Sequence, residues 1–242
     1  MAKIENGDIF TNSHNESVVV IYYLSCVKIL VEFLDENKAR KTYRAQDLRN
    51  GSFKNPYRRT VRGVGYIGQG KYSALFEGAE TTAYSFWLRM MNRCYSGCKS
   101  VKNVTYLDCT VSSEWHNFQE FAEWFYNYPK YFKGYELDKD ILVKGNKIYS
   151  YEACCLVPKE INSFFTNTSG NSGVYYNKDS GNFVSRVSVG GKRKVIGRFD
   201  CKMEALKAYK KAKEAEAKIL AEYWKEKIDV LVYDKLINWE FS

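Results

Sequence analysis

Apolar and polar positions alternate early in the chain, as they do in half-buried strands. Residues 18–24 form a run of β-branched and aromatic side chains. Residues 27–33 place an apolar side chain at every second position, with charged residues on the other face. At this spacing successive apolar side chains share one face of a strand. The two runs therefore predict a β-hairpin, and residues 42–51 predict a short helix that ends at Gly51.

A glycine-rich segment, residues 63–70, follows this helix and contains a Gly-x-Gly-x-x-Gly pattern. No long strand precedes the pattern, it lacks Gly-Lys-Ser/Thr, and no helix with an acidic partner follows it. A nucleotide site is therefore not expected, and these are interpreted as turn and close-approach glycines.

The middle of the chain carries large apolar side chains at helical spacing. Residues 83–95 and 113–128 both repeat them at positions i, i+3, i+4 and i+7. Both segments predict amphipathic helices whose aromatic rings belong to a core rather than to a cofactor site. Residues 135–149 then predict a β-hairpin with a Lys-Gly-Asn loop, and Ser150 predicts the cap of a short helix that follows.

The last third of the chain predicts a three-stranded sheet and a long helix. The strands are expected at 173–176, 183–189 and 193–199, with a Gly190-Gly191 hairpin turn, and the helix at 202–227. A slim alanine stripe on the helix favours close packing on one face of the sheet, so the other face stays open. By alternation, the open face is expected to carry Tyr175, Asn177, Arg186, Ser188, Arg193 and Val195.

Together these elements predict an α+β fold in three modules. A small β-rich module is expected at 1–75, a module of helices and a hairpin at 76–165, and the three-stranded sheet with its helix at 166–242.

The charge distribution along the chain indicates which class of partner it binds. The chain has 242 residues, with 37 Lys and Arg against 28 Asp and Glu, and a net charge of +9. The three predicted modules carry net charges of +5, −1 and +5. Two basic ends suit a protein that binds a polyanion, such as double-stranded DNA, in two places. The alternative is a basic protein whose lysine-rich helices are only solvated.

Three arginines of the first module, Arg58, Arg59 and Arg62, lie between Tyr57 and Tyr66 in the sequence. Guanidinium groups bind phosphates and the neighbouring rings offer packing, so the three arginines are predicted to contact DNA. A solvated loop is the competing interpretation.

Composition excludes several other classes of protein. No apolar run reaches the ~18 residues of a membrane span, so no membrane partner is expected. The N-terminus lacks the apolar stretch of a secretory signal, and seven cysteines without a signal favour reduced thiols in the cytoplasm. The cysteine spacing lacks a paired Cys-x2-Cys, so structural zinc is not expected. A monomer is expected, without identified protein partners.

One resemblance concerns the third module. Residues 173–212 read GVYYNKDSGNFVSRVSVGGKRKVIGRFDCKMEALKAYKKA. This run resembles the AP2 DNA-binding domain, in which a three-stranded sheet reads bases in the major groove. The resemblance implies that Tyr175, Arg186 and Arg193 contact bases. The neighbouring basic residues expected to bind DNA are Lys192, Lys194 and Arg198. Val195 stands where plant members carry tryptophan, so the mode of reading is transferred but not the sequence preference.

A second resemblance covers about residues 80–165. Residues 87–95 read WLRMMNRCY, residues 111–124 read VSSEWHNFQEFAEW, and residues 137–162 read LDKDILVKGNKIYSYEACCLVPKEIN. These motifs resemble the HNH-type (ββα-metal) homing endonucleases of phages, so a phage-encoded protein would act in the host cytoplasm.

The HNH resemblance implies a single divalent cation, Mg²⁺ or Mn²⁺, held by hard oxygen ligands. The implied metal ligands are Asp138, Asp140 and Asn146, and the implied catalytic residues are these three together with Lys139. Lys139 stands where the family usually carries its histidine base. Lysine, with a pKa near ~10.4, is a poor base at neutral pH unless it is desolvated. The alternative is that these residues are only a charged flank of the hairpin.

Two functions follow as hypotheses. The first is a metal-dependent, site-specific DNA endonuclease or nickase of the phage homing type. The second is a sequence-specific DNA-binding protein, a repressor or anti-host factor, that has lost cleavage.

Overall fold

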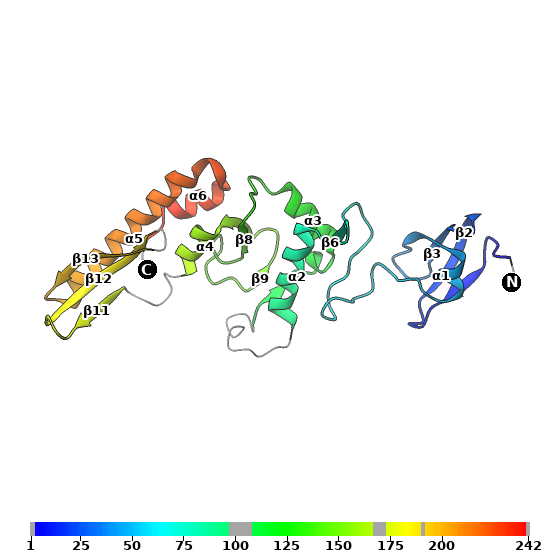
Figure 1. Cartoon of the computed structure of the whole chain (residues 1–242), viewed down its shortest axis with the longest axis horizontal. Helices are drawn as coiled ribbons and strands as arrows, with labels where there is room; N and C mark the ends of the chain where they lie inside the picture. Colours follow the sequence, from blue (N-terminus) through cyan, green and yellow to red (C-terminus); the bar gives the residue numbers. More distant parts are fainter. Residues whose placement is uncertain (1–2, 97–107, 167–172, 190–191, 241–242) are drawn as a thin grey trace. The chain divides into compact units, whose positions relative to one another are not determined.

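The computed structural model describes residues 3–96, 108–166, 173–189 and 192–240 of the chain (Figure 1). It has a mixed α+β fold, as predicted, with several small antiparallel sheets and helices between them. The chain divides into two units, Met1–Leu107 with Val111–Phe125, and Asp108–Thr110 with Tyr126–Ser242. The predicted modules 1–75, 76–165 and 166–242 remain a prediction.

The first unit begins with a four-stranded antiparallel sheet in the order β1-β2-β3-β4. Its elements are β1 (Ile9–Thr11), β2 (Ser17–Ser25), β3 (Lys28–Phe33), β4 (Arg40–Tyr43) and the short helix α1 (Ala45–Arg49). The predicted hairpin is confirmed, and the helix predicted over 42–51 is present but shorter, because residues 42–43 belong to β4. Apolar side chains at alternate positions of β2 and β3 pack against Leu48 and Phe53 in one core, so burial fixes which face of the sheet points inward.

Glycines after this sheet allow the chain to pass close to the helices. A Cβ on Gly65 would lie 2.8 Å from the ring of Trp87, and a Cβ on Gly70 would collide with the side chain of Gln119. The prediction of close-approach glycines is therefore confirmed at these two positions.

Aromatic packing dominates the rest of the first unit. The elements are the hairpin β5 (Leu75–Phe76) and β6 (Ala79–Glu80), the helix α2 (Thr82–Tyr95), the 3-10 helix η2 (Glu114–His116) and the helix α3 (Phe118–Asn127). The Trp87 indole is fully buried and donates a hydrogen bond of 2.7 Å to the carbonyl of Trp115. The prediction that these rings form a core is confirmed. The predicted single helix at 113–128 is wrong, because Asn117 is extended and separates η2 from α3.

The second unit contains a strand pair with a helix behind it. Strand β8 (Tyr135–Asp138) pairs antiparallel with β10 (Cys155–Pro158), and α4 (Lys159–Thr166) follows directly. Between them, the chain passes through β9 (Ile148–Tyr149), and the Lys147 carbonyl accepts a hydrogen bond from the N–H of Thr110 in β7 (Thr110–Val111).

The predicted hairpin of residues 135–149 is therefore wrong in its partner strand. The four residues of β10 are all buried, with Leu156 and Val157 fully so, and β8 gains the larger apolar contact by pairing with β10. The helix predicted after Ser150 is also wrong, because residues 151–153 form a turn that leads into β10.

The second unit ends in the predicted three-stranded sheet, in the order β11-β12-β13. Its elements are β11 (Val174–Asn177), β12 (Asn182–Val189), β13 (Lys192–Phe199), α5 (Lys202–Trp224), the 3-10 helix η3 (Lys225–Lys227) and α6 (Val230–Ile237). The strands and the long helix are confirmed, whereas α6 was not predicted. The predicted Gly190-Gly191 turn lies outside the described residues.

Helix α5 uses two different faces along its length. Ala205 and Tyr209 are buried near the sheet, whereas Leu220 and Ala221 belong to a core shared with α4 and α6. The predicted alanine stripe does not extend along the whole helix: Ala215 is exposed, and Ile219 one turn later is 65% exposed, because the buried face of the helix changes between its two halves. No helix in the described residues is long and apolar enough to cross a membrane.

Candidate functional site

The open face of the β11-β12-β13 sheet is the first candidate surface. Residues that are direct cross-strand partners lie on the same face of a sheet. Tyr175 pairs with Val184 and Val184 with Arg198, while Arg186 pairs with Val195 and Ser188 with Arg193. We define the open face by these residues: Tyr175, Val184, Arg186, Ser188, Arg193, Val195 and Arg198.

A β-bulge in β13 decides which basic residues share this face. Ser185 pairs with Gly197 and Arg186 with Val195, so Ile196 is one extra residue on β13. Because of this extra residue, Arg198 lies on the open face. Simple alternation from Arg193 would place it on the opposite face.

The remaining two basic residues of β13 have different places. Lys194 pairs with Val187, and therefore lies on the other face, where Val187 and Ser185 are buried and α5 contacts the sheet. This agrees with the alternation, which did not place Lys194 on the open face; its predicted contact with DNA remains a prediction. Lys192 begins β13, and its side chain lies outside the described residues.

Arg186 is held in place on the open face by an aromatic ring. Its guanidinium carbon lies 4.2 Å from the centroid of the Tyr175 ring, a cation–π contact. Tyr175 is 40% exposed, and Val184 is buried beneath its neighbours. Among the described residues, Arg186, Arg193 and Arg198 form no ion pair, and the three strands contain no Asp or Glu. The face is therefore positively charged without internal neutralisation.

The predicted arginines of the first module do not share one role. Arg59 is exposed. The exposed Arg62 has a positive φ of 54° and donates from Nε to the Asn92 side chain. Arg58 is half-buried, and its guanidinium lies 4.0 Å from the carboxylate of Glu16. The rings of Tyr57 and Tyr66 pack against each other, with centroids 5.7 Å apart, and their predicted packing on DNA remains a prediction.

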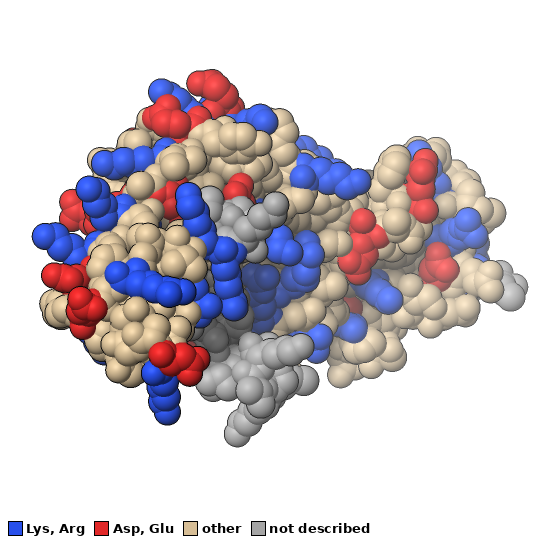
Figure 2. Space-filling model, turned by 60° about the vertical axis from the view of Figure 1, so that its left-hand side comes forward, with Lys and Arg blue, Asp and Glu red and all other residues tan. Residues whose placement is uncertain are grey.

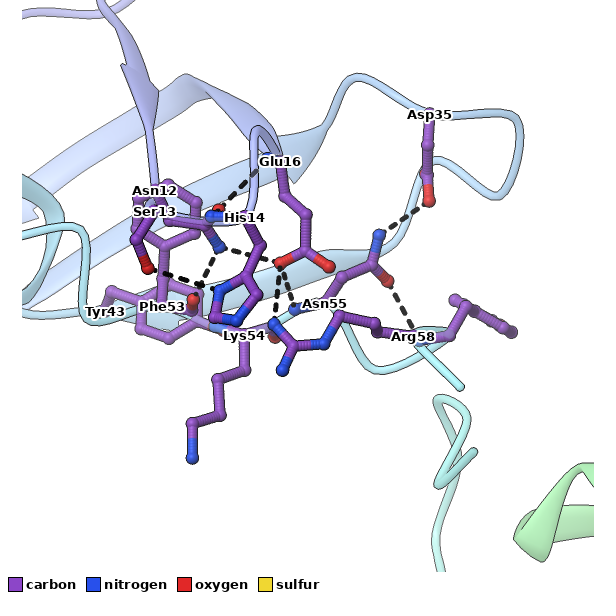
Figure 3. A network of polar contacts seen from close by, with 11 residues as sticks. Asn12, Ser13, His14, Glu16, Asp35, Tyr43, Phe53, Lys54, Asn55 and Arg58 are labelled. Atoms are coloured by element: carbon purple, nitrogen blue, oxygen red, sulfur yellow. Dashed lines mark hydrogen bonds and ion pairs between the residues drawn. The ribbon is translucent and has the colours of Figure 1, made fainter. Parts of the chain in front are cut away.

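Arg58 belongs to a network that joins three loops of the first unit (Figure 3). The buried Asn12 donates to Glu16 at 2.7 Å and to the Phe53 carbonyl at 3.0 Å, and Asn55 donates to Asp35 at 2.7 Å. Burial is the largest single effect and raises the pKa of Asp35, but its several hydrogen bonds together outweigh it and hold that pKa below the ordinary value. The network fixes the segment that carries Arg58, so a structural role for this arginine is sufficient to explain it.

The predicted catalytic residues lie at the end of β8 and in the loop that follows. Asp138 is the last residue of β8, and its Oδ1 accepts hydrogen bonds from the backbone N–H groups of Asp140 and Ile141, at 2.7 and 2.8 Å. Burial raises the pKa of the Asp138 carboxyl, and these two bonds only partly oppose the effect. Asp140 lies beyond the end of β8, so the two aspartates do not share one face of a strand.

Lys139, Asp140 and Asn146 form a closed cluster. The Lys139 ammonium is buried, and it donates to Asp140 at 2.7 Å and to the Asn146 carbonyl at 2.9 Å. The Asn146 amide donates to the carbonyls of Lys139 and Ile148, and its Oδ1 accepts from the Ile148 N–H. Burial lowers the pKa of Lys139, but the ion pair with Asp140 outweighs it and raises the pKa overall. Lys139 is therefore protonated at neutral pH and unsuited to act as a base.

The predicted metal ligands do not fit a cation in this arrangement. The amide oxygen of Asn146 is engaged with backbone, and the carboxylate of Asp140 is paired with Lys139. Among the described residues, no group of three or more His, Cys, Asp or Glu side chains is placed to hold a metal ion.

Another set of oxygen donors in this unit was missed at the sequence level. Glu136 and Asp138 occupy alternate positions of β8, and both are half-buried. Asn162 of α4 donates to the Glu136 carboxylate at 2.6 Å. Asn162 is the last residue of the motif at residues 137–162, so the sequence did contain this residue as a signal. The predicted hairpin of residues 135–149 did not place α4 beside β8, and so its proximity to Glu136 could not be predicted.

The remaining titratable groups of interest are buried or half-buried. His116 contacts the Val111 carbonyl at 3.1 Å, and burial lowers its pKa. Cys154 and Cys155 are fully enclosed, and burial raises the pKa of both thiols. Neither cysteine is suited to act as a nucleophile or an exposed metal ligand.

The molecular surface carries the excess positive charge of the sequence. Figure 2 shows Lys and Arg side chains spread over the visible face. In comparisons with family models, curated proteins and solved structures, this chain has no match.

Proposed function

We propose that this chain binds double-stranded DNA at specific sites, with the open face of the β11-β12-β13 sheet placed in the major groove. The single observation that carries the proposal is the face itself, on which three arginines without ion pairs stand around an apolar centre. A three-stranded sheet is narrow enough to enter the groove, as β-sheet readers of DNA do.

The arrangement of charge supports binding to bases as well as to phosphates. Arg186 is oriented by the Tyr175 ring, so less freedom is lost when its planar guanidinium makes two parallel hydrogen bonds to guanine. Arg193 and Arg198 flank it on the same face. This is the AP2-like mode of reading, assigned here to the residues that the strand register brings together.

A selection from random duplex DNA with the full chain tests the proposal. We expect an enriched consensus and a binding constant that falls with salt. Each neutralised phosphate contributes a slope near ~0.9 in log K against log salt. A slope near zero, or equal affinity for the consensus and for random DNA, would reject DNA reading by this face.

A second candidate function is metal-dependent DNA cleavage, as in a phage homing endonuclease or nickase. The observation that favours it is the order β8, β10, α4, a ββα unit in which α4 contacts both strands. In this unit the oxygen-bearing side chains of Glu136, Asp138 and Asn162, rather than the Asp140 and Asn146 first predicted, are the better donors for Mg²⁺ or Mn²⁺. When bound, such an ion would stabilise charge on the cleaved phosphate.

Supercoiled plasmid that contains the selected site distinguishes the two functions. Nicking that requires Mg²⁺ or Mn²⁺ and stops with EDTA supports the endonuclease. DNA that is demonstrably bound but never nicked leaves the DNA-binding function alone, as in a repressor or anti-host factor.

A further inference from the structure

An exposed apolar side chain stands at the centre of the basic open face. Val195 is 55% exposed and is the direct cross-strand partner of Arg186. Arg193 lies two residues earlier on β13, and therefore on the same face. Val184, the other aliphatic residue of this face, is buried. Val195 is thus the aliphatic group that the open face presents to a ligand.

Because Val195 lies beside Arg186, the two side chains would contact groups of the DNA that are close to each other. Direct cross-strand partners have Cβ atoms about 4.5–5.5 Å apart, which is more than one but less than two of the ~3.4 Å steps between adjacent base pairs of DNA. The ring of Tyr175 contacts the Arg186 guanidinium at 4.2 Å, so the arginine is oriented before binding. A group contacted by Val195 is therefore on the same base pair as the one read by Arg186 or on its neighbour.

The chemistry of the major groove then limits the partner of Val195. Phosphates and base edges are polar, and the apolar group displayed in this groove is the C5 methyl of thymine. A branched aliphatic side chain gains nothing by facing a polar edge, because the desolvated edge loses hydrogen bonds to water. Contact with a methyl group removes apolar surface of both partners from water.

We infer that Val195 reads the C5 methyl group of a thymine next to the guanine contacted by Arg186. This inference rests on the proposed DNA-binding function and adds to it a specificity-determining residue and the base it recognises. Charge complementarity supports DNA as the occupant, since the face carries arginines and its three strands hold no acidic residue.

The test uses the full chain and a duplex of the selected consensus. Each thymine within the footprint is replaced in turn by deoxyuridine, which removes only the methyl group. At one position we expect wild-type affinity to fall about fourfold, the effect of losing one buried methyl-sized group. Val195→Ala should bind the thymine and deoxyuridine duplexes equally at that position.

Two further variants make the result specific. Val195→Thr keeps one methyl group of the branched side chain and is expected to retain part of the discrimination. Val230→Ala removes a valine that is also exposed, at 66%, but lies at the start of α6. It should keep the full fourfold preference for thymine.

The outcomes separate this inference from the function on which it rests. If the chain binds no consensus, the DNA-binding proposal itself fails. If it binds a consensus but no deoxyuridine substitution matters, or if Val195→Ala keeps the methyl preference, DNA binding stands and the role of Val195 is rejected. A consensus without any thymine in the footprint rejects it as well.

Discussion

Two clusters of charged side chains in the second unit differ in what they leave available. In the Lys139–Asp140–Asn146 cluster, each described polar group bonds to another member or to nearby backbone. On the open face, Arg186, Arg193 and Arg198 have no ion pair among the described residues, and Arg186 is held only by an aromatic ring. Polar groups that are hydrogen-bonded to one another stabilise a loop. Charged groups that are held in position but form no ion pair are available to bind a ligand.

From the sequence motifs alone, the LDKD segment would be ranked above the sheet as the functional site, and the contacts indicate the opposite order. The LDKD motif looked like the centre of the chemistry, but its lysine neutralises its own neighbour. The less specific sheet motif yields a surface whose arginines are open to a ligand. Substitutions in the two clusters should therefore have different consequences.

The largest effect is expected from the open face. Arg186→Ala and Arg193→Ala should each weaken binding to the consensus about 10- to 100-fold, because each removes a guanidinium able to bond to a base. Binding to random DNA should fall much less. Competition titrations with the consensus and with random duplex measure both.

Lys207→Ala is the control for this pair, because Lys207 is an exposed lysine of α5 and lies outside the open face. It should weaken specific and random binding alike. Equal losses on both kinds of DNA for the arginine variants would contradict base reading by the sheet.

The next effect concerns the closed cluster. Asn146→Ala removes three hydrogen bonds to the backbone of Lys139 and Ile148. We expect the local free energy of opening to fall by about 1–2 kcal/mol, while DNA affinity stays unchanged. Hydrogen exchange of peptides that cover residues 135–158 measures the opening.

The neighbouring Lys147 is exposed and provides the matched control. Lys147→Ala should change local opening by less than about 0.5 kcal/mol. If Asn146→Ala abolished consensus binding without altering hydrogen exchange, the loop would be part of the DNA surface and the comparison would fail.

Much of this architecture could be predicted from local patterns. The β2–β3 hairpin, α2 and the three C-terminal strands follow from periodicity over a few residues, because each of these elements buries one face. The pairing of β8 with β10 could not be predicted in this way. Its strands are separated by a sixteen-residue excursion from Lys139 to Cys154, and the uniformly buried β10 shows no alternation.

The site shows the same limit at the level of single residues. Alternation from Arg193 excludes Arg198 from the open face and cannot detect the extra residue Ile196 that restores it. Similarly, Lys213 of α5 is buried although lysines are usually exposed, with Glu216 at 2.7 Å and the Phe164 ring at 4.1 Å. A bulge and a buried ion pair both depend on neighbours that are distant in sequence.

A smaller effect should distinguish the two partners of the closed ion pair. Lys139→Met replaces a buried ammonium by an apolar chain of similar length and leaves Asp140 half in solvent. Asp140→Ala instead leaves the buried Lys139 charge without its carboxylate, which is the costlier change. We expect Asp140→Ala to lower the thermal midpoint more than Lys139→Met.

The same pair tests the chemistry of the second candidate function. Because Lys139 is held protonated, Lys139→Met should leave any Mg²⁺-dependent nicking within about twofold of wild type. Loss of nicking in a folded Lys139→Met variant that still binds DNA would return Lys139 to the active centre. It would also remove the main contrast between the two clusters.

The smallest effect extends the comparison to the first unit, where His116 is a further closed polar group. Burial lowers its pKa below the ordinary value of about 6.5, so the unfolded chain takes up a proton at a pH where the folded unit does not. The stability due to the neutral ring is present above that pH and is lost as the pH falls through the folded pKa. Between pH 7.5 and 5, His116→Gln should therefore lose less thermal stability than wild type.

His14→Gln, which changes the exposed second histidine of the same unit, should follow wild type. Because His116 is engaged with Val111 rather than open to a ligand, its protonation should not alter the DNA sequence preference. A consensus that changed with pH in wild type but not in His116→Gln would show that a closed polar group can still govern recognition.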